Sequence, residues 1–276
     1  MRKLLWLFVL SSLVLLNACS PSPVSSDTSE TPDLAGEITF AGSTTVQPLA
    51  NEIGAAFTEA HPDVTLDIAA GGSEVGIRAI HDGTVDIGMA SRALTPEEAE
   101  GITPHQIAVD VIAVIVNEAN PVGDLTLAQL EAIYLGEITN WRDVGGEDAP
   151  ITVVIRDINS GTRGAFDKIV LKGAEPASPN LKKALAASDV AVQVRDNPYA
   201  LGYVGFGHLD SGLKALNIEG VAPSAETARD GSYKVTRPLQ LMTGPLSQPL
   251  AKTYVEFALS EAGQQVVAES GWVPAK

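Results

Sequence analysis

The chain is organised around the stretch ITVVIRDINSGTRGAF, residues 151–166. Residues 151–155 are apolar or β-branched and predict a strand. The polar turn Arg156–Arg163 follows, and residues 165–171 have the spacing of a short helix. A helix start offers unpaired N–H groups and the positive end of a dipole, and this turn adds hydroxyl and guanidinium donors. The stretch therefore predicts a strand, an anion-holding turn and a helix, although Ser-Gly-Thr at a helix start is also typical of plain N-capping.

Four turns share this composition of hydroxyl residues, glycine and arginine. They are Ser43-Thr44-Thr45, Ser73, Ser91-Arg92, and Arg156 with Ser160-Gly161-Thr162. The strands that precede them are predicted at residues 37–40, 64–68, 84–89 and 151–155. Ligands of open α/β sheets bind outside the carboxyl ends of the strands, so we expect the four turns to meet at one anion site. Independent N-capping would explain each turn singly, but not the arginines in two of them.

The rest of the chain alternates between predicted strands and helices, which indicates an α/β architecture. Further strands are predicted at residues 106–116, 190–194, 201–206 and 235–242. Further helices are predicted from Val46, at 75–80, after the capping box Thr95–Glu98, at 126–134, at 181–187, and as one or two helices over 250–269. Residues 120–123 interrupt the pattern, and we place the first crossing between two lobes there, with the strand over 235–242 as the return.

The N-terminal segment has the features of a targeting signal. Two basic residues precede the apolar run 4–16, which is too short for a membrane span, and Cys19 follows shortly after it as the only cysteine of the chain. This resembles a bacterial lipoprotein signal. The resemblance implies a signal peptide over 1–18, a lipidated Cys19 and a disordered tether over 19–36; the alternative is an ordinary secretory signal with an incidental cysteine. A lipidated Cys19 leaves no thiol for a disulfide, a nucleophile or a metal.

Composition and motifs argue against several function classes. The chain has 18 basic and 34 acidic residues, a formal net charge of −16, so we expect no nucleic-acid partner. There is no Gly-x-Ser-x-Gly nucleophile elbow and no Walker loop, and the four histidines are far apart in sequence. We therefore expect no enzyme activity, no metal and no cofactor.

Six motifs follow one another along the chain. They are Gly42–Pro48, Gly71–Ser73, Asp86–Arg92, Arg156–Arg163, Asn197–Tyr203 and Thr236–Leu239. In order, spacing and residue type they resemble the landmarks of bacterial phosphate-binding proteins of phosphate ABC transporters, from about Ile38 to the end of the chain. The resemblance implies a periplasmic binding protein type II fold, with two α/β lobes, two crossings and a ligand cleft. We assign residues 37–116 and 239–276 to lobe 1 and residues 117–238 to lobe 2.

The resemblance also implies a function and a site. The function is binding of inorganic phosphate outside the cytoplasmic membrane and its delivery to the permease of an ABC transporter by lobe closure. We expect a monomer without a cofactor, anchored by lipid at the outer face of the cytoplasmic membrane or lying in the periplasm. The implied phosphate-binding residues are Ser43, Thr44, Thr45, Ser73, Ser91, Arg92, Arg156, Ser160, Gly161 and Thr162.

One residue departs from the family pattern. The best-known branch of the family has an aspartate at the position of Arg92, and that aspartate accepts the proton of hydrogen phosphate. An arginine has no acceptor, so hydroxyl oxygens of Ser43, Thr44 or Ser73 would have to serve, with Asp157 as a weaker candidate. Two alternatives stay open, the first because of Arg92 and the second because the permease would be a separate chain. One is a binding protein for another oxyanion, such as sulfate, molybdate or tungstate; the other is a lipid-anchored sensor or adhesin without a transporter.

Overall fold

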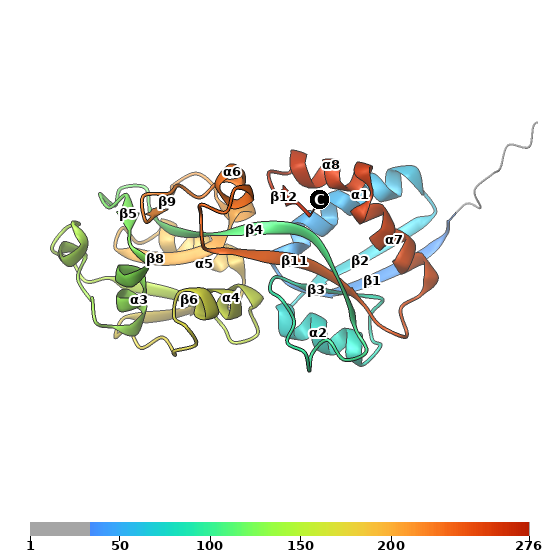
Figure 1. The fold of residues 1–276 in the computed structure, drawn as a ribbon, viewed down its shortest axis with the longest axis horizontal. Coiled ribbons are helices and arrows are strands. Elements are labelled where there is room, and N and C mark those ends of the chain that lie inside the picture. The colour runs from blue at the N-terminus through green and yellow to red at the C-terminus, as the bar shows by residue number, and fades with distance from the viewer. Residues whose placement is uncertain (1–33, 276) are drawn as a thin grey trace, which may run out of the picture. The chain divides into compact units, whose positions relative to one another are not determined.

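One sheet runs through two α/β lobes in the computed structural model, which describes residues 34–275 (Figure 1). Its strands lie in the order β2-β1-β3-β11-β4-β8-β6-β7, and β9 and β12 also pair with β4. The long strand β4 (Thr103–Asn117) pairs with β11 as far as Val111 and with β8 from Ile112, so it belongs to both lobes. The lobe boundaries predicted at 116/117 and 238/239 stay predictions. The predicted signal peptide, Cys19 and nearly all of the tether lie outside the described residues.

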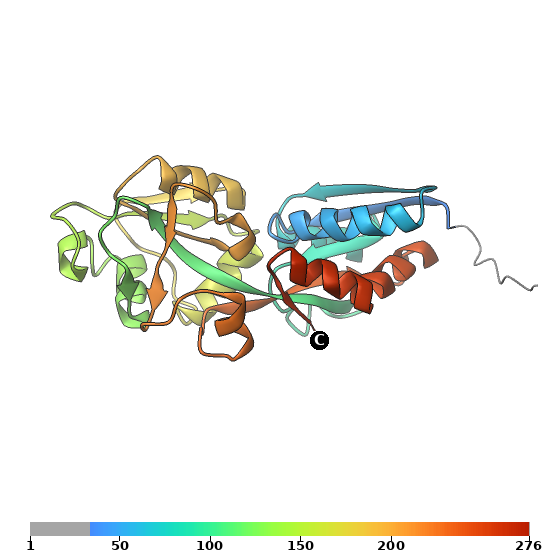
Figure 2. The same ribbon diagram turned by 90° about the horizontal axis from the view of Figure 1, so that it is seen from above.

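The first lobe combines both ends of the described chain. Its elements are β1 (Gly36–Gly42), α1 (Val46–Ala60), β2 (Val64–Ala70), α2 (Ser73–His81), β3 (Ile87–Ala90), β11 (Thr236–Thr243), α7 (Pro249–Leu259), α8 (Glu261–Glu269) and β12 (Val273–Pro274). Helices α1, α7 and α8 lie on one side of the sheet and α2 lies on the other (Figures 1 and 2). Apolar residues of α1, α7 and α8 form one core cluster, and those of α2 belong to a separate cluster. β1 is parallel to β2 and β3, so the carboxyl ends of these three strands meet at one edge.

The second lobe is the intervening segment. Its elements are β5 (Asp124–Leu125), α3 (Leu127–Leu135), the 3-10 helix η1 (Trp141–Val144), β6 (Thr152–Arg156), α4 (Gly161–Ile169), β7 (Leu181–Ala184), α5 (Ala187–Arg195), β8 (Ala200–Gly205), the 3-10 helix η2 (Phe206–His208), β9 (Leu213–Ala215), β10 (Asn217–Ile218) and α6 (Ala225–Arg229). Phe166 of α4 stacks on Tyr203 of β8 at a ring-centroid distance of 4.0 Å, which fixes α4 against the sheet. α5 packs in a separate cluster with Val190 and Val194. None of the helices within residues 34–275 is both long and apolar enough to cross a membrane.

Most predicted elements are confirmed, but residues 181–195 are an exception. The predicted helix 181–187 is largely the strand β7, which continues the sheet in parallel beside β6, and the predicted strand 190–194 lies in helix α5. Val190, Ala191 and Val194 are buried on one face of α5 at helical spacing. At the start of α5 the Asp189 carboxylate accepts a hydrogen bond from Ala186 N at 2.9 Å. Helix capping and sheet pairing together override the local pattern.

The capping box predicted at residues 95–98 forms, but only a turn follows it. Glu98 Oε2 accepts from Thr95 N at 2.9 Å, and Thr95 Oγ1 accepts from Glu98 N at 3.3 Å. Gly101 then adopts a φ of +73°, and Ile102 turns into the core. The prediction of a helix after residues 95–98 was therefore wrong, because the chain leaves helical geometry after one turn.

Candidate anion-binding site

Hydroxyl residues of the first lobe lie buried at the carboxyl edge of its sheet. Ser43 follows β1, Ser73 begins α2 and Ser91 follows β3. Backbone N–H groups already use acceptor positions on two of them. Thr45 N and Val46 N each donate to Ser43 Oγ at 3.2 Å, and Ser91 N donates to Ser73 Oγ at 3.0 Å. Since a hydroxyl has one proton and two lone pairs, Ser43 is left with a proton to donate.

In the second lobe, the turn after β6 becomes the first turn of α4. Ser160 is the N-cap, and its Oγ accepts from Arg163 N at 3.3 Å. The helix therefore begins at Gly161, four residues before the predicted start at residue 165. Gly161 and Thr162 are buried in the first turn, where backbone N–H groups have no partner within the helix. The hydroxyl groups of Ser160 and Thr162 thus lie at this helix start, and their contact with an anion stays a prediction.

Arg156 is a buried cation at the end of β6, with a relative exposure of 1%. Its Nη2 donates to Leu185 O at 2.8 Å, whereas Nε has no hydrogen-bond partner among the described residues. Burial lowers the pKa of Arg156, and the nearby positive charge of Arg237 lowers it further. The carboxylate of Asp157 offsets part of this lowering, and a bound anion would supply the acceptor that Nε lacks.

The two lobes touch across these turns. Thr45 Oγ1 lies 3.2 Å from Thr162 Oγ1, and Glu74 N donates to Asn159 O at 3.2 Å. Gly161 fits so tightly between the lobes that a Cβ atom there would lie 2.1 Å from Ser73 Oγ. The structure therefore brings together hydroxyl groups and a helix start that are about one hundred residues apart in sequence.

Two further residues complete the cluster, and sequence reasoning missed both as site residues. Arg237 of β11 donates to Asp110 Oδ2 of β4 through Nε at 2.9 Å and Nη2 at 2.7 Å. Its Nη2 also lies 3.3 Å from Thr45 Oγ1, and its Nη1 lies 3.4 Å from Ser91 Oγ. Burial lowers the pKa of Arg237, and each partner favours the charged form of the other. The ion pair thus joins the two crossing strands to the hydroxyl groups.

A signal for this pair was present in the sequence. Asp110 interrupts the otherwise apolar run 107–116, which predicts a strand buried on both faces. A carboxylate at such a position is almost never fully buried without a partner. Arg237 lies within another predicted strand, 127 residues away, and no local pattern pairs it with Asp110.

Arg92 and Thr44, two of the predicted site residues, make no side-chain hydrogen bond to the other predicted site residues. Arg92 directs its guanidinium away to two carboxylates: Nη1 and Nη2 donate to the two Glu98 oxygens at 2.7 Å, and Nη2 also bonds Glu74. The hydrogen bonds to Glu98 raise the pKa of Arg92. Its stem packs on Gly164 of the second lobe. Thr44 is half-buried, and the structure records no side-chain hydrogen bond for it.

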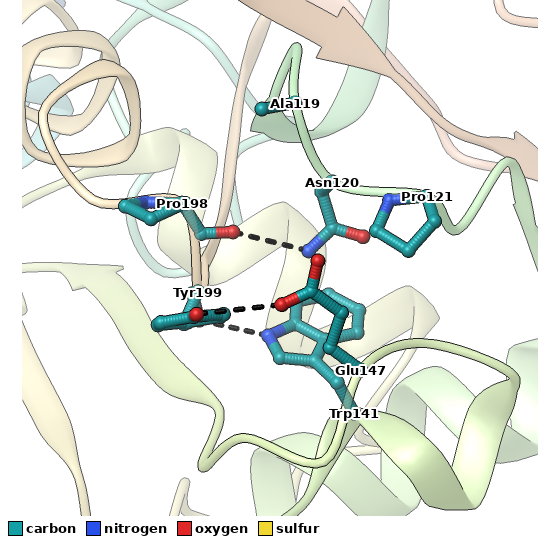
Figure 3. A pocket seen from close by; sticks show the side chains of 7 residues that line it. All are labelled: Ala119, Asn120, Pro121, Trp141, Glu147, Pro198 and Tyr199. Atoms are coloured by element: carbon teal, nitrogen blue, oxygen red, sulfur yellow. Dashed lines mark hydrogen bonds between the residues drawn. The ribbon is translucent and has the colours of Figure 1, made fainter.

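A separate small cavity lies in the second lobe (Figure 3), with a volume of about 80 Å³. It is lined by Ala119, Asn120, Pro121, Trp141, Glu147, Pro198 and Tyr199. Its polar groups pair with one another: Trp141 Nε1 donates to Tyr199 O at 2.9 Å, and Tyr199 OH donates to Glu147 Oε2 at 3.3 Å. No lining residue is cationic and Glu147 is a carboxylate, so this cavity does not suit an anion.

Among residues 34–275, no three His, Cys, Asp or Glu side chains cluster to hold a metal ion.

Known proteins that resemble this chain in sequence and in structure include phosphate-binding proteins. A family model described as a PBP superfamily domain matches residues 27–262. The phosphate-binding protein PstS of Bacillus subtilis is 33% identical, over 99% of this chain and 94% of its own length. A crystal structure of a phosphate ABC transporter substrate-binding protein with bound phosphate, from Clostridium perfringens, is 38% identical with a TM-score of 0.83, covering 87% of this chain and all of that one. An ABC-type phosphate transport receptor from Vibrio cholerae is 32% identical with a TM-score of 0.72, over 87% of this chain and all of that one.

Proposed function

Because the chain belongs to the PBP superfamily and, within it, to the family of the phosphate-binding protein PstS, we propose that it binds inorganic phosphate for an ABC transporter. The family consists of substrate-binding proteins, not of enzymes. The observation that carries the proposal is the buried Arg156, whose Nε has no hydrogen-bond partner among the described residues. The charge of Arg237, which donates to the hydroxyl groups of Thr45 and Ser91, acts on Arg156. A tetrahedral anion with several acceptor oxygens would satisfy all of these donors at once.

The proposed ligand set comes from both lobes. The first lobe would supply Ser43, Thr44, Thr45, Ser73 and Ser91, and the second lobe Arg156, Ser160, Gly161 and Thr162. A micromolar dissociation constant corresponds to about 8 kcal/mol. Hydrogen bonds to charged groups contribute roughly 1.5–3 kcal/mol each, so this number of donors is sufficient after the entropic cost of association.

Arg237 and Arg92 would have supporting roles. Arg237 is held by Asp110 and hydrogen-bonds hydroxyl oxygens of Thr45 and Ser91, which supports a role in turning their protons toward the ligand. Arg92 was predicted to bind phosphate directly. Since Glu74 and Glu98 occupy its donors, we propose instead that it supports the wall of the site against α4.

Lobe closure would complete the site. Each lobe alone offers only part of the donor set, so a bound anion favours the state in which the lobes touch. Delivery to a membrane permease would follow from recognition of that state. This family works outside the cytoplasmic membrane. We propose that the chain is held there by lipid on Cys19, which is supported by the sequence of residues 1–19 alone.

Another oxyanion is the second candidate. Backbone N–H groups donate to Ser43 and Ser73, and Arg237 donates to Thr45 and Ser91. These donors occupy both lone pairs of Ser43 and one each of Ser73, Thr45 and Ser91, which reduces the acceptors for the proton of hydrogen phosphate, whereas sulfate carries no proton at neutral pH. This observation favours sulfate, or a similar dianion, as the competitor.

Calorimetric titration of the purified chain, stripped of bound anion, tests both candidates. We expect micromolar or tighter binding of phosphate, with sulfate at least a hundredfold weaker. Equal binding of the two anions would replace the phosphate assignment with a general oxyanion carrier. Binding of neither would refute the anion site itself.

A further inference from the structure

The cavity of Figure 3 lies where two Asn-Pro turns of the second lobe meet, and hydrogen bonds fix its walls. Asn120 Nδ2 donates to Pro198 O at 3.2 Å. Asn197 Oδ1 accepts from Tyr199 N at 3.0 Å, and Tyr199 O accepts from Trp141 Nε1 at 2.9 Å. The turn at Asn197 opens one of the six sequence motifs, and the anion site does not use this turn. The cavity is thus a second preformed pocket.

The side-chain donors that line this cavity are already in use, whereas some acceptors are not. Asn120 Nδ2 and Trp141 Nε1 donate to carbonyl oxygens. Tyr199 OH donates to Glu147 Oε2 at 3.3 Å. Glu147 Oε1 has no hydrogen-bond partner among the described residues, and the carbonyl oxygen of Pro198 keeps a second lone pair. The lining therefore suits a ligand that donates hydrogen bonds and accepts none.

Charge and aromatic rings indicate the same kind of ligand. Glu147 is the only charged residue of the lining. Trp141 and Tyr199 supply aromatic rings, whose negative faces attract cations, and tryptophan does so most strongly. Lys214 Nζ already donates to Asn120 O, so a carbonyl oxygen of this wall accepts from an ammonium group of the chain itself. The lining thus favours a cation.

The volume of the cavity, about 80 Å³, limits the size of that cation. A water molecule takes up roughly 30 Å³ in the liquid, so the cavity has room for about two or three groups of that size. Methylammonium, or the end of a lysine side chain, fits this space, whereas tetramethylammonium with its four methyl groups is too large. Tyr199 is 37% exposed and Glu147 is exposed, so the mouth of the cavity is open to solvent.

We propose that this cavity is a binding site for a primary ammonium group. The ammonium would donate to Glu147 Oε1 and Pro198 O, and the carbon next to it would lie against the aromatic rings. Thr152 of β6 pairs with Ala200 of β8, so the cavity lies near the first residues of these parallel strands, whereas Arg156 ends β6 at the anion site. The inference therefore goes beyond phosphate binding and does not depend on it.

The fluorescence of Trp141 tests the proposal, because Trp6→Phe with Trp272→Phe leaves it as the only tryptophan of the chain. Methylammonium chloride, compared with the same concentrations of sodium chloride, should change the emission saturably, with a dissociation constant of about 1–10 mM. Glu147→Gln should weaken this binding by about tenfold or more. Glu97→Gln, which removes the same charge at an exposed position of the first lobe, is the matched control and should stay within about twofold of the parent.

Two further measurements separate the ring from the charge and the binding from the substitutions. Tyr199→Leu removes one ring and keeps the Glu147 carboxylate, and it should weaken binding by at least about fivefold. The indole N–H resonance of Trp141, followed by NMR in the isotope-labelled chain without the two tryptophan substitutions, should give the same dissociation constant. This second readout decides the question if the substituted chain does not fold.

No saturable response to methylammonium, or an unchanged response in Glu147→Gln, would overturn the proposal. An equal response to potassium chloride would replace the ammonium group with an alkali ion, and an equal response to tetramethylammonium would place the cation outside the cavity. Nα-acetyl-lysine methylamide is the second probe. If it binds at least about tenfold more tightly than methylammonium, the source is a lysine side chain; otherwise it is a small free amine. A chain that binds no phosphate would refute the proposed function and leave these results as they are.

Discussion

The hydroxyl oxygens of Thr45 and Thr162 lie 3.2 Å apart, although 117 residues separate them in the chain. Thr45 precedes α1 of the first lobe and Thr162 lies in the first turn of α4 of the second lobe. Each is buried, so this contact exists only when the lobes are together. Substitutions near this contact show which residues contribute to anion affinity and which contribute to the stability of the fold.

Gly161→Ala should block closure. An added Cβ would lie 2.1 Å from Ser73 Oγ and 2.8 Å from Ser91 Oγ, and both serines are buried with little room to move. Overpacking of this kind costs roughly 1–3 kcal/mol, which corresponds to about a five- to 150-fold loss of phosphate affinity. Calorimetry measures the loss. Gly123→Ala is the control, because nothing lies within 4 Å of its Cβ position. Unchanged affinity in Gly161→Ala would mean that phosphate binds with the lobes apart.

Arg156→Met should abolish phosphate binding and yet stabilise the ligand-free protein. The guanidinium is desolvated and its Nε has no partner, so an apolar side chain of similar length removes an unfavourable burial. We expect at least a hundredfold weaker binding, together with a raised urea midpoint in the absence of phosphate. Arg92→Met is the comparison. Since its donors bind Glu74 and Glu98, we expect an affinity loss below about fivefold. Equal losses in the two variants would contradict the assignment of the primary cation to Arg156.

Asp110→Asn should destabilise the fold. Asp110 and Arg237 are both fully buried, and removal of one partner of such a pair costs roughly 3–5 kcal/mol. The double variant Asp110→Leu with Arg237→Met should recover most of that stability but not the phosphate affinity, because Thr45 and Ser91 would lose the Arg237 donors. Urea unfolding and calorimetry separate the two effects. Recovery of both would show that the pair is purely structural.

Stability should fall as the pH falls below 6.5, because of His208. Burial, followed by the positive charges of Arg237 and Arg156, lowers its pKa to about 4, and Asp210 offsets only part of this. Its pKa in the unfolded chain is about 6.5, so between pH 6.5 and pH 4 the unfolded state binds more protons than the folded state. The free energy of unfolding therefore decreases as the pH decreases through this range. We expect a loss of about 1–2 kcal/mol between pH 7 and pH 5 in the free energy of unfolding.

The variant His208→Gln should flatten this dependence, and His81→Gln, at an exposed position, should leave it as it is. Urea midpoints at the two pH values, measured without phosphate, provide the comparison. A pH dependence in His208→Gln as steep as in the parent would assign the effect to other groups.

The fold and much of the candidate site follow from local patterns. The strands β1, β2 and β3, which precede Ser43, Ser73 and Ser91, are short, and their parallel pairing brings these three residues to one edge of the sheet. Strand β6 ends at Arg156 in the second lobe, and only the contact between the lobes brings its end to the same place. Thr126 likewise caps helix α3, and both hydrogen bonds of the capping box that it forms with Gln129 are present.

The remaining features depend on tertiary contacts that no local pattern contains. Residues 181–184 form a strand only because β6 offers a free edge beside them. The donors of Arg92 are occupied because Glu74, on another element, reaches the same guanidinium as Glu98. Asp110 stood out in sequence as a charge in an apolar strand, but its partner lies 127 residues away on β11. Such pairings become visible only when the two crossing strands lie side by side.

The crossing strands also bear on the ancestry of the chain. Ile112 N donates to Val235 O at 2.9 Å, so the segment between them leaves and re-enters the first lobe at adjacent points. Insertions are tolerated best where the two ends of the added segment lie close together at the boundary of a host domain. Residues 112–235 thus have the geometry of a segment inserted into the first lobe. Chimaeras that exchange this segment between relatives would leave the backbone of the first lobe unchanged.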